Sequence, residues 1–155
     1  MNIQEITNHL ELQPHPEGGY YKETYRSDES CINGTRSICT VIYFLLTSEN
    51  CSKFHRIQSD EIWYFHAGSP LIVHTLNSKG YNQHFVGNNL LAGETPQLLV
   101  PKNTIFGSTV KDDNSYSLVS CSVSPGFEFN DFELFKKEEL ISLYPEQEKI
   151  ITQLT

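Results

Sequence analysis

The sequence predicts an all-β sandwich or barrel with short helices at its two ends. Between Tyr20 and about Val123, apolar and polar residues alternate in short runs, as they do in half-buried strands. Turn-forming clusters such as Pro16-Glu17-Gly18-Gly19 and Ala67-Gly68-Ser69-Pro70 separate these runs. Many short strands at regular spacing are typical of sandwiches and barrels.

Each strand is predicted from its own apolar run. The predicted strands are Tyr20–Arg26, Ser37–Leu46, Lys53–Ile57, Glu61–His66, Leu71–Leu76, Tyr81–Val86, Gln97–Val100, Ile105–Val110 and Ser115–Val123. We expect one domain over residues 1–155, with the barrel at about 20–124.

Helical periodicity appears outside the barrel. Ile3, Ile6 and Leu10 predict an amphipathic helix over residues 3–11, with Asn2 as its cap. The helical period returns in the segment at about 130–155. We expect the C-terminal helices to cap an open end of the barrel or to cover an edge strand.

Composition excludes several classes of protein. A chain of 155 residues with 38% hydrophobic and 12% aromatic residues has enough apolar material for one core. Eleven Lys and Arg against nineteen Asp and Glu give a net charge of −8 without a basic stripe, so neither nucleic acid nor a membrane surface is an expected partner. The chain shows no secretory signal and no run long enough to span a bilayer, and we expect a cytoplasmic protein.

The four cysteines are expected to be reduced thiols. Cys31, Cys39, Cys51 and Cys121 show no CxxC spacing, and a cytoplasmic domain of this size needs no disulfide. Cys39 and Cys121 lie in strand-like runs and are interpreted as small core residues.

The segment around His55 carries the most information on chemistry. Glu61 and Trp63 share one face of their strand, and His55 and Ile57 share a face of the preceding one. A histidine and a carboxylate can therefore meet inside the barrel, and we expect His55 to pair with the buried Glu61. The residues leave two interpretations equally open, a structural pair that fixes the register and a functional site.

This segment resembles the first motif of the cupin superfamily, in which HxH is followed by a glutamate and then a glycine. His55, Glu61 and Gly68 match the motif, and Ile57 stands at the second histidine. Metal-dependent cupins use roughly three His and one Glu as ligands. The resemblance implies that His55 and Glu61 are retained from this set and that Ile57 replaces one of the histidines.

The second cupin motif, PxGxxH, is more strongly altered. Pro101 is retained, but Asn103 replaces the glycine and Phe106 the histidine. Because a tight transition-metal site has three or four protein ligands, we expect no obligatory metal and no cofactor.

Further blocks along most of the chain are similar to the Cupin_5 family. They include Leu12–Tyr21, Arg26-Ser27, Ile42–Leu46, Phe54–Arg56, Ser59–Trp63, Gly93-Glu94, Pro96-Gln97, Val100-Pro101, Phe106-Gly107, Tyr116–Val119, Val123–Phe129 and Asp131–Leu134. The resemblance implies a double-stranded β-helix, or jelly roll, and a homodimer. The family is one of unknown function, so the resemblance implies the architecture and not the reaction.

At the level of the fold, the family resembles the nucleotide-sugar 3,5-epimerases, which are cupins without metal ligands. Such an enzyme needs a base, a carboxylate that holds the base, and an acid on the opposite face of the sugar. The resemblance assigns the base pair to His55 with Glu61 or Asp60, and the acid to Tyr116 or Tyr43. Catalytic residues are therefore predicted to be His55, Glu61 and Tyr116.

A ligand would need stacking surfaces and polar anchors. Arginines can bind a phosphate or carboxylate, aromatic rings can stack, and an amide can line a pocket. The predicted ligand-binding residues are Arg26, Arg36, Tyr43, Arg56, Trp63, Gln97, Phe106 and Phe127.

The block from Pro14 to Tyr20 allows two interpretations. Two glycines permit a sharp turn, and Glu17 beside them can point into a neighbouring pocket. We favour a rigid turn that fixes the first strand, with His15 in a structural role.

Together these features predict a protein that binds a small molecule. The favoured function is a metal-independent isomerase or epimerase that acts on a sugar-like or nucleotide-sugar substrate. The alternatives are a non-catalytic module that binds or senses a metabolite, and an enzyme that binds a metal weakly.

Overall fold

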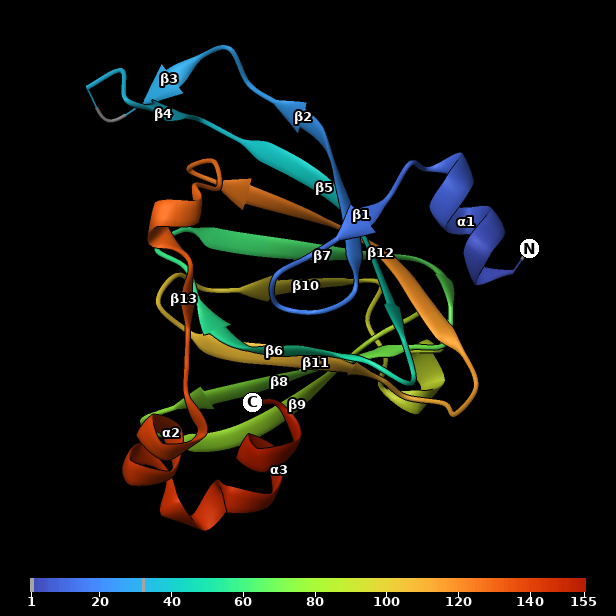
Figure 1. Cartoon of the computed structure of the whole chain (residues 1–155), viewed down its shortest axis with the longest axis vertical. Helices are drawn as coiled ribbons and strands as arrows, with labels where there is room; N and C mark the ends of the chain where they lie inside the picture. The colour runs from blue at the N-terminus through green and yellow to red at the C-terminus, as the bar shows by residue number, and fades with distance from the viewer. Residues whose placement is uncertain (1, 32) are drawn as a thin grey trace.

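Two antiparallel sheets pack against each other and form most of the protein (Figure 1). The computed structural model describes residues 2–31 and 33–155. The larger sheet consists of β1 (Gln13–Pro14), β2 (Tyr20–Arg26), β5 (Thr40–Thr47), β12 (Tyr116–Ser124), β7 (Asp60–Gly68) and β10 (Gln97–Val100), in that order. The second sheet consists of β13 (Glu133–Leu134), β6 (Cys51–Arg56), β11 (Ile105–Val110), β8 (Leu71–Asn77) and β9 (Gly80–Val86).

The main core lies between the two sheets. Phe44 and Trp63 from the larger sheet pack with Val73 and Phe106 from the second sheet, and each side chain is at most 1% exposed. Their strands alternate inward and outward residues, as the sequence pattern requires. The all-β architecture that the sequence predicts is confirmed.

The nine predicted strands all occur. Tyr20–Arg26, Gln97–Val100 and Ile105–Val110 have the predicted bounds, and the other strands differ from their predictions by a few residues. A small ribbon that was not predicted, β3 (Ser30–Cys31) with β4 (Arg36–Ser37), extends from the ends of β2 and β5 (Figure 1).

The N-terminal helix α1 (Ile3–His9) is confirmed and ends two residues earlier than predicted. The side chain of Asn2 accepts a hydrogen bond from the backbone N–H of Glu5, and the Glu5 carboxylate accepts one from the N–H of Asn2. This reciprocal cap fixes the start of the helix. Glu11 takes a positive φ of 53°, so the helical conformation does not continue to that residue.

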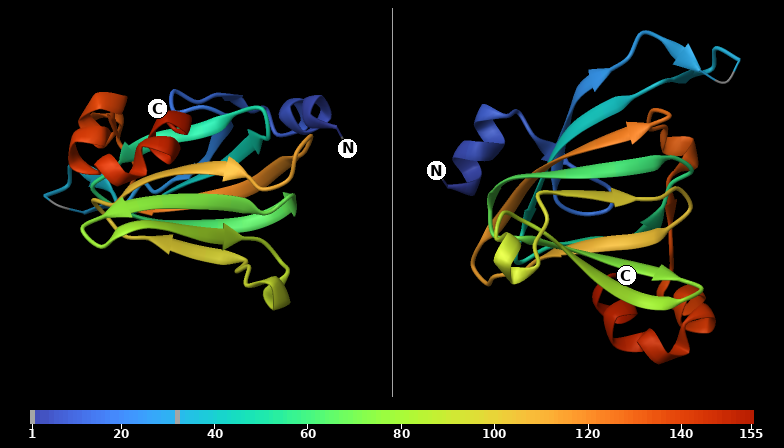
Figure 2. Two further views of the ribbon diagram at one scale, coloured as in Figure 1. Left: turned by 90° about the horizontal axis from the view of Figure 1, so that it is seen from below. Right: turned by 180° about the vertical axis from the view of Figure 1, so that it is seen from behind.

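The C-terminal helices α2 (Lys137–Leu143) and α3 (Glu148–Gln153) cover the outer face of the second sheet (Figure 2). Leu140 and Ile151 pack against Phe54 and Ile105, all at most 5% exposed. The free edge of β6 pairs with β13 immediately before these helices. The segment therefore covers an edge strand and a sheet face rather than an open end of the barrel.

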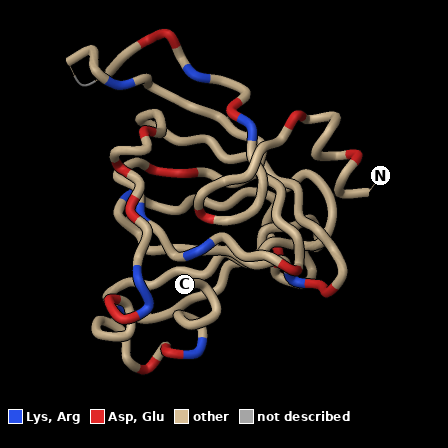
Figure 3. The backbone as a smooth tube through the Cα atoms, in the orientation of Figure 1, with Lys and Arg blue, Asp and Glu red and all other residues tan. Residues whose placement is uncertain are grey.

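Three 3-10 turns complete the elements. They are η1 (Leu90–Ala92), η2 (Phe129–Asp131) and η3 (Pro145–Gln147). Basic residues are interspersed with the acidic excess along the chain (Figure 3). In the described part of the chain, none of the helices has the length and apolarity needed to cross a membrane.

Candidate functional site

A cavity of about 270 Å³ opens between β2, β5 and β12 of the larger sheet and the end of β6. Its polar lining residues are Gln13, His15, Glu17, Glu23, Arg26, Thr40, His55, Glu61 and Cys121. Its aromatic and aliphatic lining residues are Tyr21, Ile42, Ile57, Val123, Phe127, Phe129 and Phe132. Of the predicted site residues, the structure brings His55, Glu61, Arg26 and Phe127 together here.

The turn before β2 delivers Glu17 into the cavity. The backbone N–H of Gly18 donates to the carbonyl of His15, and the N–H of Lys53 donates to the carbonyl of Glu17. Gly18 has a φ of 111°, and a Cβ at this position would lie 2.0 Å from the carbonyl oxygen of Cys51. The turn can therefore approach β6 only because this residue is glycine. The turn is bound to β6 as well as to β2, and it also carries Glu17 into the cavity, which is the alternative that the sequence favoured less.

Glu17, and not Glu61, is the ion-pair partner of His55. Glu17 Oε2 lies 2.8 Å from His55 Nε2, and both side chains are at most 7% exposed. Burial lowers the pKa of His55, but the Glu17 carboxylate outweighs this effect and holds the pKa above its usual 6.5. Burial raises the pKa of Glu17, but the charge and hydrogen bond of His55 hold it below 4.5. Both shifts favour the ionised form of the pair, an imidazolium bound to a carboxylate.

Both ring nitrogens of His55 are engaged by the protein. Nδ1 lies 2.7 Å from the carbonyl oxygen of Lys53, and Nε2 faces Glu17. The protonated ring therefore donates both of its protons within the chain.

Glu61 lies in the same cavity, is 8% exposed and forms no ion pair in the described part of the chain. The thiol of Cys121 lies beside its carboxyl group and lowers the pKa of Glu61 slightly against the effect of burial. Burial, and next to it the negative charge of Glu17, raise the pKa of Glu61 to about 7. A carboxyl group with this pKa can both accept and release a proton near neutral pH.

His15 is a second cavity imidazole with a different charge state. Burial lowers the pKa of His15 below 6.5, so the ring is neutral at neutral pH. Its Nδ1 accepts the backbone N–H of Glu17 over 3.1 Å, which places the ring proton on Nε2. Within residues 2–31 and 33–155 that Nε2–H has no hydrogen-bond acceptor, and it is free for a ligand.

A wall of phenylalanines closes one side of the cavity. Phe127 and Phe129 pack with their ring centroids 4.9 Å apart, and Phe132 lies 5.2 Å from the ring of His55. The loop that carries these rings is attached to the larger sheet. The backbone N–H of Phe127 donates to Thr40 Oγ1 over 2.9 Å.

Arg26 and Arg36 hold this loop. Arg26 donates to the carbonyl of Phe127 over 2.9 Å and to the Glu128 carboxylate over 3.1 Å. Arg36 donates to the carbonyl of Gly126 over 3.1 Å and forms an ion pair with Asp131. Arg26 lines the cavity, whereas Arg36 does not.

Most of the other predicted residues lie away from the cavity. Tyr43 and Tyr116 pack around Leu45 on the outer face of the larger sheet, because their strands turn Ile42 and Cys121 inward. Gln97 is exposed on β10. Arg56 binds Glu133 at the outside edge of β6.

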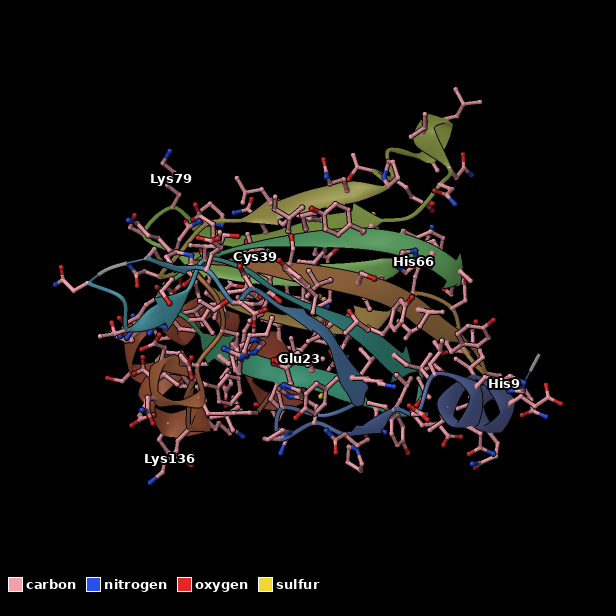
Figure 4. The ribbon with its side chains drawn as sticks, turned by 90° about the horizontal axis from the view of Figure 1, so that it is seen from above. His9, Glu23, Cys39, His66, Lys79 and Lys136 are labelled. Atoms are coloured by element: carbon pink, nitrogen blue, oxygen red, sulfur yellow. The ribbon has the colours of Figure 1, made fainter. Side chains whose placement is uncertain are left out.

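His66 also lies on this outer face of the larger sheet. Its Nε2 lies 2.5 Å from Ser120 Oγ, and Figure 4 shows His66 well apart from Glu23 of the cavity. Trp63 and Phe106 face inward but lie in the core beneath the cavity, where Phe106 packs 4.2 Å from the His55 ring. They support the site without lining it.

Sequence reasoning missed several cavity residues. Tyr21 and Glu23 are two residues apart in the strand after the predicted turn, so their side chains lie on the same face of the sheet and both line the cavity. The alternation of side chains along the strand could have identified them. Phe129 and Phe132 follow β12. The helical period predicted from about residue 130 is wrong for this part, which forms the 3-10 turn η2 and the short strand β13 before α2 begins at Lys137, and no local pattern indicates that it folds back over the cavity.

The donor set does not fit a cupin metal. Ile57 and Phe106, at two of the four ligand positions, have no donor atom. Both nitrogens of His55 are engaged by Lys53 and Glu17. Among the residues that the structure describes, no three His, Cys, Asp or Glu side chains are grouped as metal ligands.

Comparisons with known proteins agree with this architecture. The model of the Cupin_5 family, described as "Cupin superfamily (DUF985)", matches residues 4–135. The uncharacterized protein YML079W of Saccharomyces cerevisiae is 31% identical, and the alignment covers 89% of this chain and 77% of the yeast protein.

Solved structures give the same result. Protein SO0799 of Shewanella oneidensis has a TM-score of 0.95 at 44% identity, covering 100% of this chain and 98% of that one. A hypothetical protein from Leishmania major has a TM-score of 0.93 at 41% identity, covering 100% and 99%. Oxalate decarboxylase of Bacillus subtilis shares the fold alone, with a TM-score of 0.60 at 15% identity over 92% of this chain and 37% of that one.

Proposed function

We propose that the cavity of this chain, which belongs to the Cupin_5 family of the cupin superfamily, binds a small polar organic molecule. In this proposal the protein moves a proton on a carbon next to a carbonyl group of that molecule. This is the reaction of a metal-independent isomerase or epimerase. The observation that supports it is that the Glu61 carboxyl group and the His55–Glu17 ion pair line one cavity. The comparisons with known proteins identify the family but do not identify a reaction.

Glu61 is the base in this proposal. Its ionised carboxylate accepts the proton from the carbon, the electron pair of the C–H bond forms the new C=C bond, and the π pair of the C=O bond moves to the oxygen, which gives an enolate. A pKa of about 7 suits a group that must take up and return a proton near neutral pH. The same carboxyl group can return the proton to the neighbouring carbon of an isomerised product.

His55 supports the enolate by its charge. It is protonated and donates both N–H groups within the protein, so it does not act as the base that the sequence predicted. Its positive charge stabilises the negative charge of the enolate. The Nε2–H of the neutral His15 is the donor available for the carbonyl oxygen.

An epimerase also needs an acid that protonates the opposite face of the carbon. Tyr21 is the tyrosine that lines the cavity, and it takes the role assigned to Tyr116 from the sequence. Its ring lies 4.6 Å from that of His15.

The cavity limits the size of the substrate. Its volume of about 270 Å³ is below the roughly 300–1,000 Å³ of pockets that enclose drug-sized ligands. It suits the sugar-like part of a substrate. The diphosphate of a nucleotide sugar would find no unpaired arginine, since Arg26, Arg36 and Arg56 are all bound to carboxylates.

A binding module without turnover is the second candidate. It is favoured by the engagement of both His55 nitrogens, which removes one acid-base group from the cavity. The same cavity residues would then bind a metabolite without moving a proton.

Solvent exchange separates the two functions. Sugars and oxo acids that bind the protein are incubated with it in D₂O, and deuterium in the recovered compound is measured by mass spectrometry. We expect incorporation with wild type and with Glu138→Gln, an exposed control on α2, and a loss of about 100-fold or more with Glu61→Gln. Binding without incorporation above the protein-free rate, for every compound that binds, contradicts the isomerase and supports the binding module.

A further inference from the structure

The charged side chains that line the cavity do not balance one another. The lining carboxyl groups are Glu17, Glu23 and Glu61, and the lining groups that can carry a positive charge are Arg26 and His55, whose pKa is raised by Glu17. His15 adds no charge because it is neutral. Once Glu61 is ionised, the lining residues carry an excess of negative charge.

Each of the two cations is already bound to a carboxylate. Arg26 contacts both oxygens of Glu23, over 2.9 and 3.0 Å, and also Glu128. His55 is bound to Glu17 over 2.8 Å. Because ion pairs with good geometry satisfy the charges of both partners, neither cation is available to an anionic ligand.

Glu61 is the carboxyl group without a cation of its own. It is 8% exposed, and in the described part of the chain it forms no ion pair. The charge of His55 favours the ionised form of Glu61, but His55 is already bound to Glu17, and an ionised carboxylate buried without an ion-pair partner of its own is costly. A ligand with a positive charge would remove this cost, whereas an anionic ligand would increase it.

The aromatic residues of the cavity lining also suit a cation. Tyr21, Phe127, Phe129 and Phe132 present aromatic rings, whose faces carry partial negative charge. Aromatic faces attract ammonium groups, and more strongly where water is excluded.

We propose that the cavity selects a ligand with a protonated amine, which binds the Glu61 carboxylate between the aromatic rings of Tyr21 and the phenylalanine wall. The proposal rests on the proposed function only in taking this cavity as the ligand site. Binding is an equilibrium property and is tested without turnover.

Three probes of one carbon skeleton test the charge preference. They are n-butylamine, n-butanol and butanoate, which are cationic, neutral and anionic at pH 7.5, since an alkyl amine resembles the lysine side chain in its pKa. Dissociation constants for the full chain are measured by ligand-detected NMR. We expect butylammonium to bind at least about tenfold more tightly than butanol, and butanoate to bind most weakly.

Two variants identify the residue responsible. Glu61→Gln keeps a hydrogen-bonding side chain of nearly the same shape but removes the charge, and we expect butylammonium to lose its preference over butanol. The control Glu138→Gln removes an exposed charge far from the cavity lining, and the preference should remain. A retained preference in Glu61→Gln overturns the assignment to Glu61.

Binding of the three probes to the wild-type protein tests the proposal without any variant. Equal binding of the three probes, tighter binding of butanoate, or absence of butylammonium binding overturns it. These outcomes differ from failure of the proposed function, because a protein that binds butylammonium selectively but exchanges no deuterium into any bound compound retains the amine site and loses the isomerase.

Discussion

Glu17 and His55 form a buried ion pair over 2.8 Å, although one lies in the turn before β2 and the other in β6. The backbone of the turn is bound to the same strand, since the carbonyl of Glu17 accepts the N–H of Lys53. The ion pair therefore connects the N-terminal segment to the second sheet at the base of the cavity. It places a fixed positive charge beside Glu61 while satisfying that charge within the protein.

Glu17→Gln should lower the pKa of His55. In wild type the Glu17 carboxylate raises this pKa against the effect of burial, and without the carboxylate burial dominates. We expect the pKa of His55 to shift from above 6.5 to below it, measured by NMR titration of the ring.

The same substitution should reduce the free energy of unfolding at pH 6 by about 3 kcal/mol, because it leaves one member of a buried pair without its partner. Glu49→Gln, an exposed position in the turn before β6, is the control and should change neither quantity. An unchanged His55 titration in Glu17→Gln would show that the pair does not set the charge of the ring.

Glu61→Gln should stabilise the protein at alkaline pH. The pKa of Glu61 is raised to about 7 in the fold, so the folded state binds the proton more tightly than the unfolded state does. The stability that this group contributes is fully present below the unfolded pKa of 4.5 and is lost as the pH rises through 7. Relative to its effect at pH 4.5, the Gln variant should gain about 3 kcal/mol over wild type at pH 8.

Urea unfolding of both proteins from pH 4.5 to 8 measures this difference. The comparison must use the pair of proteins, because His74 has the opposite slope. Burial lowers the pKa of His74 to about 4, so its contribution to stability falls as the pH drops from 6.5 towards 4. A difference between the two proteins that does not change with pH would contradict the buried, titrating Glu61.

The sequence predicts the strands more fully than it predicts the site. Strand periodicity is local, and it is sufficient to place Glu61 and His55 on inward faces. The pairing of His55 with Glu17 is not local, because it depends on how closely the turn approaches β6, and that distance is set by Gly18. The same limit applies to Phe132, whose place in the cavity depends on the path of an irregular loop.

Once the inward face of a strand is known, the alternation of its side chains shows which predicted site residues cannot line the cavity. Tyr43 lies between Ile42 and Phe44, which both face inward, so it must face outward. The arginines were predicted from charge, and charge does not reveal that each has a carboxylate of its own. Arg56 and Glu133 meet only because β13 pairs with β6.

Gly18→Ala should destabilise the protein and disturb the cavity. A side chain at a φ of 111° is strained, and its Cβ would lie 2.0 Å from the carbonyl oxygen of Cys51. We expect a loss of about 2 kcal/mol or more in the free energy of unfolding, measured by urea denaturation. Gly34→Ala is the control, because it has a φ of 72° but no atom within 4 Å of its Cβ. Equal losses in the two variants would show that the contact with β6 adds nothing to the backbone strain.

Arg26→Met should loosen the phenylalanine wall without unfolding the barrel. Arg26 is 38% exposed, so its ion pairs contribute about 1 kcal/mol or less to stability, but its contacts with Phe127 and Glu128 hold the loop against the larger sheet. We expect faster hydrogen exchange of the Phe127 amide, which donates to Thr40, and weaker binding of any cavity ligand. Arg56→Met is the matched control, since that arginine holds Glu133 outside the cavity and is also 38% exposed. If the two variants exchange the Phe127 amide at the same rate, the wall is held by the remaining contacts of the loop and not by Arg26.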